Sequence, residues 1–268
     1  MDIIRLREID FSTFQRLQQQ GTTATIYKRD DLCLKMLTGM TGEEKDNIYL
    51  KFLDMEGLKI DGVILPKGLI MENGRLQGYY MDYFDNSQCL SDEFGVKYVD
   101  SKRLLDCVTS ASKILREIHE NDMICQDLSF ENILVDINNN VMFCDLDGCQ
   151  YKNHSAPFIS LLLKNFFIDY RREQITISKN LDRISMLLSL YYLMYEEELQ
   201  NISRRQYDKL SSKINTLEIL KEYANMLVNT SKQIGEIPYL DEVIDSSDAC
   251  VFDREKQLRL IHRIFGRI

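Results

Sequence analysis

The hydrophobic pattern changes along the chain, and this change constrains the fold more than any other feature. Before residue 85, short apolar runs bounded by turn signals, such as those at 29–31 and 72–75, are typical of strands. These runs cover residues 14–18, 25–28, 32–37, 67–71 and 77–84. After residue 100 the apolar residues recur at helical spacing. We therefore expect an α+β fold, with a small β-rich part at 1–84 and a larger, mainly helical part at 85–268.

One helix is expected among the early strands. Residues 41–56 place Ile48, Phe52 and Met55 on one stripe, which is the spacing of a helix with a single buried face. A second and longer helix is predicted at 101–119, where apolar residues again recur on one face. Strand-rich and helical segments are therefore both present, but they do not alternate regularly along the chain.

Composition and charge exclude several classes of protein. The net charge of −9 argues against a nucleic-acid-binding surface. The seven cysteines contain no C-x-x-C pair, so we expect reduced thiols rather than a disulfide or zinc framework. No apolar run is long enough to cross a bilayer, and the start lacks the pattern of a signal peptide. These features predict a cytoplasmic protein.

A predicted strand at 141–144 ends in two aspartates, Asp145 and Asp147, followed by Gly148. By itself this motif fits two chemistries. It resembles the D-x-D-G signature of haloacid-dehalogenase phosphatases, in which an aspartate attacks phosphorus, and it also resembles a metal-binding turn of kinases. The phosphatase signature requires a Thr or Ser soon afterwards and normally opens a doubly wound domain. Here Cys149 follows, and no alternating series of strands and helices comes after it.

An EF-hand calcium loop starting at Asp145 is excluded by its own spacing. The sixth position of such a loop is glycine and the twelfth is glutamate. In this chain those positions are Gln150 and Ala156.

A second motif lies upstream, where four residues separate Asp127 from Asn132. The catalytic loop of kinases has the same D-x-x-x-x-N spacing, because its Asp accepts the proton of the attacking hydroxyl while its Asn helps to bind Mg²⁺. A strand at 133–135 and the strand at 141–144 then bring Asp145 to the same metal. With this order of residues the chain resembles the protein-kinase-like superfamily.

The resemblance extends to the predicted β-rich part and implies an ATP site. Residues 17–27 are similar to a glycine-rich loop that keeps one glycine, Gly21, with Ile26 in the position of the following valine. Lys35 stands where the family has the lysine that binds the α- and β-phosphates. Residues 81–84 resemble the hinge, whose backbone at Asp82 and Phe84 would bind adenine. Leu134 is also expected to contact the nucleotide.

The resemblance implies Mg²⁺ as a cofactor, with Asn132 and Asp145 as ligands. Asp147 stands at the glycine position of the Asp-Phe-Gly turn, so it is either a further metal ligand or a turn carboxylate. The buried helix of the family's larger lobe corresponds to residues 180–194. Within it, Asp182 would accept hydrogen bonds from the backbone of the catalytic loop.

The sequence offers more than one candidate for the acidic partner of Lys35. Glu44 lies on the helical stripe of residues 41–56 and is a candidate for a Lys–Glu ion pair. Thr41 and Glu44 also form the pattern of a capping box, in which Glu44 would instead accept a backbone N–H at the start of the helix. Glu43 and Asp54 are further candidates.

Two departures from the family bear on regulation and substrate. Cys125 and Gln126 replace the His-Arg pair before the catalytic aspartate, so a switch operated by activation-loop phosphorylation is not expected. Ser129 stands where Ser/Thr protein kinases usually have lysine. Kinases of the aminoglycoside-phosphotransferase type also lack that lysine.

We expect an ATP- and Mg²⁺-dependent phosphotransferase, most simply a divergent protein Ser/Thr kinase. The alternatives are a kinase of small-molecule hydroxyls, another transfer to protein such as nucleotidylation, and a nucleotide-binding pseudokinase scaffold. Residues 252–268 have the pattern of a basic amphipathic helix. Such a helix is either the last helix of the core or a membrane contact.

Overall fold

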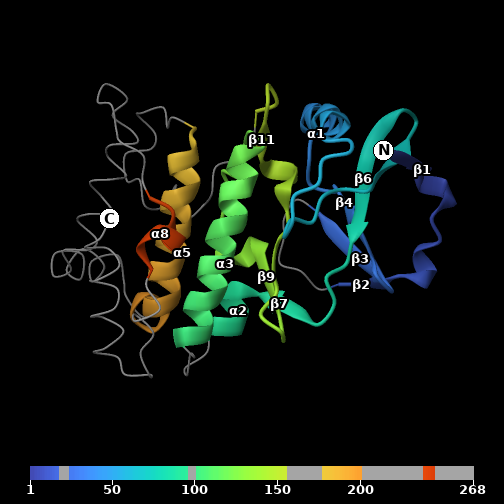
Figure 1. Cartoon of the computed structure of the whole chain (residues 1–268). Coiled ribbons are helices and arrows are strands. Elements are labelled where there is room, and N and C mark those ends of the chain that lie inside the picture. The colour runs from blue at the N-terminus through green and yellow to red at the C-terminus, as the bar shows by residue number, and fades with distance from the viewer. Residues whose placement is uncertain (18–23, 96–100, 156–176, 201–237, 245–268) are drawn as a thin grey trace.

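The computed structural model describes residues 1–17, 24–95, 101–155, 177–200 and 238–244. It shows α+β structure, with a β-rich N-terminal sheet followed mainly by helices (Figure 1). The predicted glycine-rich loop around Gly21 and the basic helix at 252–268 lie outside the described residues.

The N-terminal sheet has six strands in the order β1-β5-β6-β4-β3-β2. Its strands are β1 (Asp2–Arg5), β2 (Gln15–Arg16), β3 (Thr25–Arg29), β4 (Leu32–Met36), β5 (Gly68–Glu72) and β6 (Arg75–Asp82). Only the β1–β5 pair of this sheet is parallel. The strands predicted near residues 14, 25, 32, 67 and 77 are all confirmed, whereas β1 was not predicted.

The tight turn between β5 and β6 follows from its sequence. Asn73 has a φ of 50° and Gly74 a φ of 76°, so both central residues are left-handed. Asn and Gly tolerate this conformation better than other residues, and a turn of this kind matches the twist of the two strands it joins. The turn therefore sets the register of β5 and β6 beside it, up to the shift in register between Ile70 and Met71.

Helix α1 (Gly42–Asp54) lies beside the sheet and begins at a complete capping box. The Thr41 hydroxyl accepts from the Glu44 N–H at 3.3 Å, and the Glu44 carboxylate accepts from the Thr41 N–H at 2.7 Å. The hydrogen bond from the Thr41 backbone lowers the pKa of Glu44. Two turns further along the helix, Phe52 packs edge-on against Tyr79 of β6, with ring centroids 4.9 Å apart.

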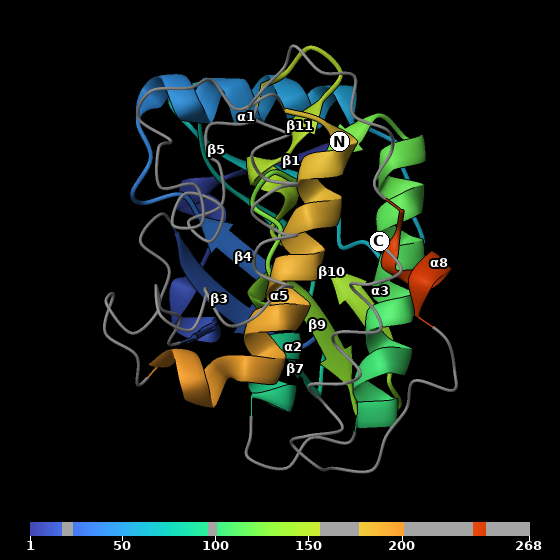
Figure 2. The same cartoon turned by 90° about the vertical axis from the view of Figure 1, so that its left-hand side faces the viewer.

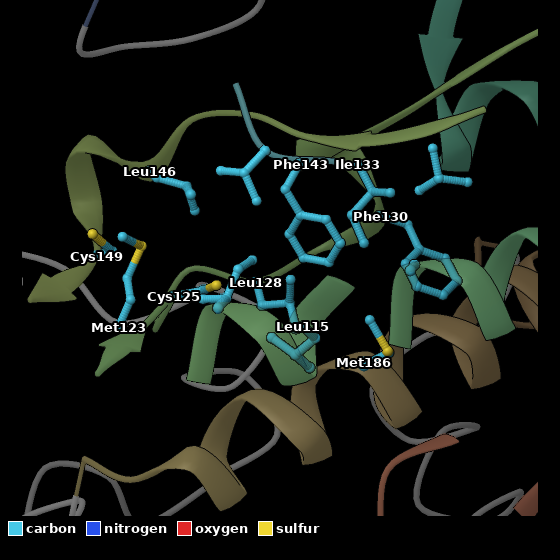
Figure 3. Packing of buried hydrophobic residues seen from close by; sticks show 14 of the residues in the cluster. Leu115, Met123, Cys125, Leu128, Phe130, Ile133, Phe143, Leu146, Cys149 and Met186 are labelled. Atoms are coloured by element: carbon cyan, nitrogen blue, oxygen red, sulfur yellow. The ribbon is translucent and has the colours of Figure 1, made fainter. Parts of the chain in front are cut away.

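The remaining elements form two small sheets and a group of helices (Figure 2). The helices are α2 (Leu90–Phe94), α3 (Ser101–Glu120), α5 (Lys179–Gln200) and α8 (Leu240–Val243). One small sheet joins β7 (Ser87–Cys89), β9 (Ile133–Asp136) and β10 (Val141–Phe143), and the other joins β8 (Met123–Ile124) and β11 (Gln150–Tyr151). The core between them includes Leu115, Phe143 and Met186, which are at most 1% exposed (Figure 3).

The boundary predicted after residue 84 falls between the last strand of the N-terminal sheet, β6, and the first strand of the next, β7. The loop before β5 contacts the part of the chain that follows this boundary. The Phe143 N–H donates to the Gly62 carbonyl at 2.7 Å, and the Ile64 N–H donates to the Phe143 carbonyl at 2.8 Å. β10 is thereby tied to the part of the chain that carries the N-terminal sheet.

In the part of the chain that the structure describes, no helix combines the length and the apolarity needed to cross a membrane.

Gly78 of β6 is expected to tolerate no side chain. A Cβ atom there would lie 2.4 Å from the carbonyl oxygen of Lys35 and 3.0 Å from the Met36 sulfur. Gly78→Ala should therefore push β4 away and lower the free energy of unfolding by about 1–3 kcal/mol. Urea denaturation measures this loss. Gly42→Ala is the control, because a Cβ at Gly42 meets nothing within 4 Å, and an unchanged midpoint for Gly78→Ala contradicts the expectation.

The buried thiols predict that the fold weakens at alkaline pH. Burial raises the pKa of Cys33 and Cys107 to about 11 and that of Cys149 to about 12. The ordinary value is 9.0, so between pH 9 and 11 the unfolded chain loses thiol protons that the folded chain keeps. The contribution of these thiols to the free energy of unfolding is therefore complete below pH 9. Above pH 9 it falls by up to about 1.4 kcal/mol per pH unit for each thiol.

One buried amine, Lys51, acts in the opposite sense, since burial lowers its pKa. It offsets the effect of a single thiol, so a net loss remains. Urea denaturation at pH 8 and pH 10, with reductant present to prevent disulfides, is the measurement. Equal free energies of unfolding at the two values would contradict the expectation.

Candidate functional site

Lys35 lies in the middle of the site. It belongs to β4, whose other inner residues are apolar, and it is only 5% exposed. Its Nζ donates to Asp147 Oδ1 at 2.9 Å and also forms an ion pair with Asp145. A buried lysine is stable only with such partners, because its charge loses the solvation of water. The structure therefore joins Lys35 to both aspartates of the D-x-D turn.

The D-x-D turn holds its two aspartates in different environments. Asp145 follows β10 with a φ of 63°, a left-handed conformation that Asp adopts more readily than most residues. Its side chain is 42% exposed, whereas that of Asp147, in the 3-10 turn η4 (Leu146–Gly148), is 4% exposed. Among the described residues, Asp147 Oδ2 is buried with no hydrogen-bond partner. One carboxylate is thus accessible, and the other is enclosed with a free oxygen.

Helix α1 contacts this turn through Lys51. Lys51 is fully buried, and its Nζ donates to the backbone carbonyls of Asp147 and Cys149, each at 2.6 Å. Lys51 was not predicted to belong to the site. Its position three residues after Ile48, on the buried face of the helix, is the signal that was available.

The predicted catalytic loop lies next to the turn. The Asn132 side chain donates to the Asp127 backbone carbonyl at 2.9 Å, which closes the loop at η3 (Phe130–Asn132). The Cys144 N–H donates to the Asn132 carbonyl at 3.0 Å. Cys144 directly precedes Asp145, so this backbone bond places Asn132 next to the D-x-D turn. The Asp127 side chain is exposed.

Asp182 of α5 is fully buried and binds the backbone of the loop. Its carboxylate accepts from the N–H groups of Cys125 at 2.7 Å and Gln126 at 2.8 Å. The predicted hydrogen bonds from the backbone of this loop to Asp182 are therefore confirmed. Gln126 has a left-handed φ of 58°, an unusual conformation for a residue other than Gly, Asn or Asp. The two bonds help to hold the loop in this strained conformation.

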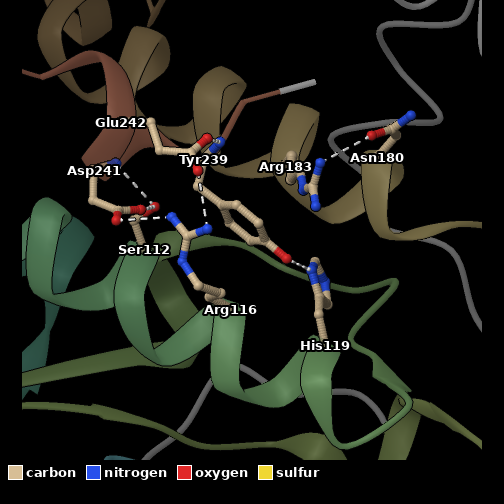
Figure 4. Close-up of polar contacts among 8 residues, drawn as sticks. All are labelled: Ser112, Arg116, His119, Asn180, Arg183, Tyr239, Asp241 and Glu242. Carbon is tan, nitrogen blue, oxygen red and sulfur yellow. Dashed lines mark hydrogen bonds and ion pairs between the residues drawn. The ribbon is translucent and has the colours of Figure 1, made fainter. Parts of the chain in front are cut away.

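A polar chain connects Asp182 to Tyr239, the residue before helix α8, and Figure 4 shows its links from His119 onward. His119, which was not predicted to belong to the site, places Nε2 3.0 Å from Asp182 and Nδ1 2.8 Å from the Tyr239 hydroxyl. Arg116 of α3 pairs with Asp241 and Glu242, each at 2.9 Å. The segment around Tyr239 therefore contacts α3 and, through His119, the Asp182 carboxylate that binds the loop.

Two of the residues predicted to contact nucleotide lie on strands that pair with β4, the strand of Lys35. Ile26 of β3 pairs directly with Lys35, and Asp82 pairs with Leu32 at the end of β4. The Asp82 side chain forms an ion pair with Lys67 at the surface. The Phe84 carbonyl accepts from the Ser87 hydroxyl at 2.6 Å.

Leu134 belongs to β9, on the other side of the boundary, and is half-buried. In register it faces Met142 of β10 and Cys89 of β7. Gly21 lies outside the described residues.

Of the two roles open to Glu44, the structure shows the capping box with Thr41. Lys35 takes its acidic partners from the D-x-D turn and not from the helix. Asp54, another candidate, accepts from His154 Nε2 at 2.7 Å. The physical reason is local: Glu44 is the third residue of its helix, where a carboxylate satisfies the first backbone N–H groups.

The residues at the turn suit Mg²⁺. Asn132, Asp145 and Asp147 offer amide and carboxylate oxygens, and the partnerless buried Oδ2 of Asp147 is an acceptor that a cation would satisfy. Within the described ranges, no group of three or more His, Cys, Asp or Glu residues gathers as a complete metal cage. Mg²⁺ does not require such a cage, because it commonly takes one or two carboxylates and completes its shell with phosphate and water.

Comparison with models of known protein families gives no match to this chain, and comparison with curated proteins gives none either. The function is therefore inferred from the residues and their geometry.

Proposed function

We propose that this chain is an ATP- and Mg²⁺-dependent phosphotransferase with a two-lobed, protein-kinase-like fold. One observation carries the proposal: Lys35 contacts Asp145, which lies 110 residues away in sequence, and Asn132 is hydrogen-bonded next to that aspartate. A buried lysine, two carboxylates and an amide at the meeting point of two sheets are the groups that phosphoryl transfer requires.

Each residue has a role in this proposal. Lys35 would bind the α- and β-phosphates, in exchange for one of its present carboxylate partners. Asn132 and Asp145 would hold Mg²⁺, with Asp147 Oδ2 available to the same ion, and the bound ion would neutralise phosphate charge. Asp127 would orient the acceptor hydroxyl and take its proton. Positioning and neutralisation of charge supply most of the catalysis in such a site.

The nucleotide would lie between the two parts of the chain. The backbone of Asp82 and Phe84 would bind adenine, while Ile26 and Leu134 would cover its faces. Gly21 would belong to the loop over the phosphates. We place this activity in the cytoplasm, and the free cysteines among the described residues support a reducing compartment.

A protein Ser/Thr side chain is the first choice of acceptor. A small-molecule hydroxyl is the second choice, and Ser129 favours it, because this loop position carries lysine in most protein kinases. In the structure Ser129 lies directly before η3, between Asp127 and Asn132. A lysine is thus absent from the position that would assist a protein substrate.

The test is transfer of label from γ-labelled ATP with Mg²⁺, to the chain itself, to generic proteins and to a panel of small hydroxyl compounds. The expected result is label in at least one acceptor for the wild type and a loss on the order of 10²-fold or more for Asp127→Asn. Label from α-labelled ATP instead would indicate nucleotidylation. No transfer and no hydrolysis above the variant would reject the enzyme and leave a nucleotide-binding scaffold.

A further inference from the structure

The proposed reaction requires an anion that keeps Lys35 in place while Asp145 turns to the metal. The helix beside the sheet is the expected source of that anion. In α1, however, Glu44 is engaged by Thr41 at the start of the helix. The buried side chain of α1 that contacts the D-x-D turn is Lys51, which is a cation.

Asp147 has the properties that such an anchor needs. Its Oδ1 is 2.9 Å from Lys35 Nζ, and its side chain is 4% exposed, against 42% for Asp145. Its own backbone carbonyl accepts from Lys51 Nζ at 2.6 Å. Asp145, on the accessible side of the turn, is therefore free to change partners. Asp147 is held by Lys35 at its side chain and by Lys51 at its backbone carbonyl.

We propose that Asp147 is the positioning residue of Lys35, and that Lys51 fixes Asp147 by binding the carbonyls of its turn. In the Lys–Glu ion pair considered for Glu44, the helix would supply the anion. In this arrangement the turn supplies the anion, Asp147, and the helix supplies a cation, Lys51. This inference rests on the proposed function, since it assigns the group that orients the phosphate-binding lysine.

A purely structural role explains the geometry less well. A buried carboxylate with one oxygen unpaired costs stability, because that oxygen has lost its hydrogen bonds to water. A buried lysine such as Lys51 adds a further desolvation cost, and apolar replacements of buried charges are often neutral or stabilising. Two such groups placed against one turn are therefore better explained by a functional requirement of that turn.

The test is a double-mutant cycle on nucleotide affinity, measured by titrating ATP in EDTA so that no metal contributes. The variants are Lys35→Met, Asp147→Asn and the pair. Asp147→Asn should weaken ATP binding about ten- to a hundredfold. The pair should bind no more weakly than Lys35→Met alone, because Asp147 acts through Lys35. The urea midpoint of Asp147→Asn should not fall, which separates positioning from a structural defect.

Two comparison variants sharpen the cycle. Lys51→Met has a similar shape without the charge, so it is expected to fold, and it should show the same loss, again masked by Lys35→Met. Glu44→Gln keeps the capping box and should bind ATP like the wild type. A loss for Glu44→Gln that Lys35→Met masks would identify the helix acid as the anchor and overturn the proposal.

Other outcomes also overturn it. Wild-type affinity in Asp147→Asn, or losses that add to those of Lys35→Met, would show that Asp147 does not act through Lys35. A loss that appears only when Mg²⁺ replaces EDTA would make Asp147 a metal ligand alone. If the wild type binds and transfers phosphate in these cases, only this inference fails. If the wild type binds no ATP with or without Mg²⁺, the proposed function fails as well.

Discussion

Replacing Asp145 with Asn is expected to lower the turnover of phosphotransfer by about 10²- to 10³-fold while leaving the fold intact. The carboxylate is the most exposed acidic group of the turn, and in our account it binds the metal that neutralises the transferred phosphate. An amide oxygen is a weaker ligand for a hard cation. Steady-state kinetics at saturating ATP and Mg²⁺ measure the effect.

Asn is the informative substitution because of the backbone. Asp145 has a φ of 63°, and Asn adopts this left-handed conformation more readily than Ala does. Lys35 also keeps its second partner, Asp147. Asp30→Asn is the matched control, since Asp30 is another left-handed aspartate, with a φ of 50°, on the exposed turn between β3 and β4. Full turnover in Asp145→Asn would contradict the metal-ligand role.

Replacing Asp182 with Ala is expected to have the largest effect on stability, a loss of about 3–5 kcal/mol in the free energy of unfolding. The change removes the acceptor of the Cys125 and Gln126 N–H groups and of the His119 contact, all in a fully buried position. Domains of this kind are stable by only about 5–15 kcal/mol, so much of the stability would be lost. Urea denaturation followed by circular dichroism measures it.

A second Asp–His pair in the chain provides the control. Asp54 accepts from His154 Nε2 at 2.7 Å, but its side chain is 52% exposed. Water can replace this partner, so Asp54→Ala should change the free energy of unfolding by no more than about 0.5 kcal/mol. Equal losses for Asp182→Ala and Asp54→Ala would show that burial does not decide the strength of these contacts.

The sequence predicted the elements whose signals are local. The turn at Asn73 and Gly74, the capping box at Thr41 and the buried stripe of α1 all depend on residues within a few positions of one another. The spacing between Asp127 and Asn132 is also local, and the structure places both in one closed loop. These parts of the fold and of the candidate site could therefore be read directly.

Features that depend on contacts distant in sequence were missed. β1 is a short strand whose residues are mostly exposed, and only its parallel pairing with β5 defines it. Lys51 and His119 have the appearance of surface residues on amphipathic helices, yet both are buried. Their partners, the carbonyls of the D-x-D turn and the Asp182 carboxylate, lie tens of residues away, so a local pattern can place Lys51 on the buried face of its helix but cannot identify these contacts.

The acidic partner of Lys35 was also missed, because that contact too joins residues distant in sequence. Glu44 matched two patterns, and the capping box was the one formed with neighbours in sequence. Asp147 was assigned to the metal, or to the turn, and not to Lys35. Its contact with Lys35 spans 112 residues and depends on how β4 and the turn meet in space.

The most direct measurement of the central claim is a calorimetric titration of ATP into the wild type and Asp145→Asn, each with and without Mg²⁺. Our account predicts that the wild type binds ATP and that Mg²⁺ tightens the binding, while Asp145→Asn loses most of the response to Mg²⁺. Absence of ATP binding to the wild type in the presence of Mg²⁺, or an equal response to Mg²⁺ in both proteins, would contradict it.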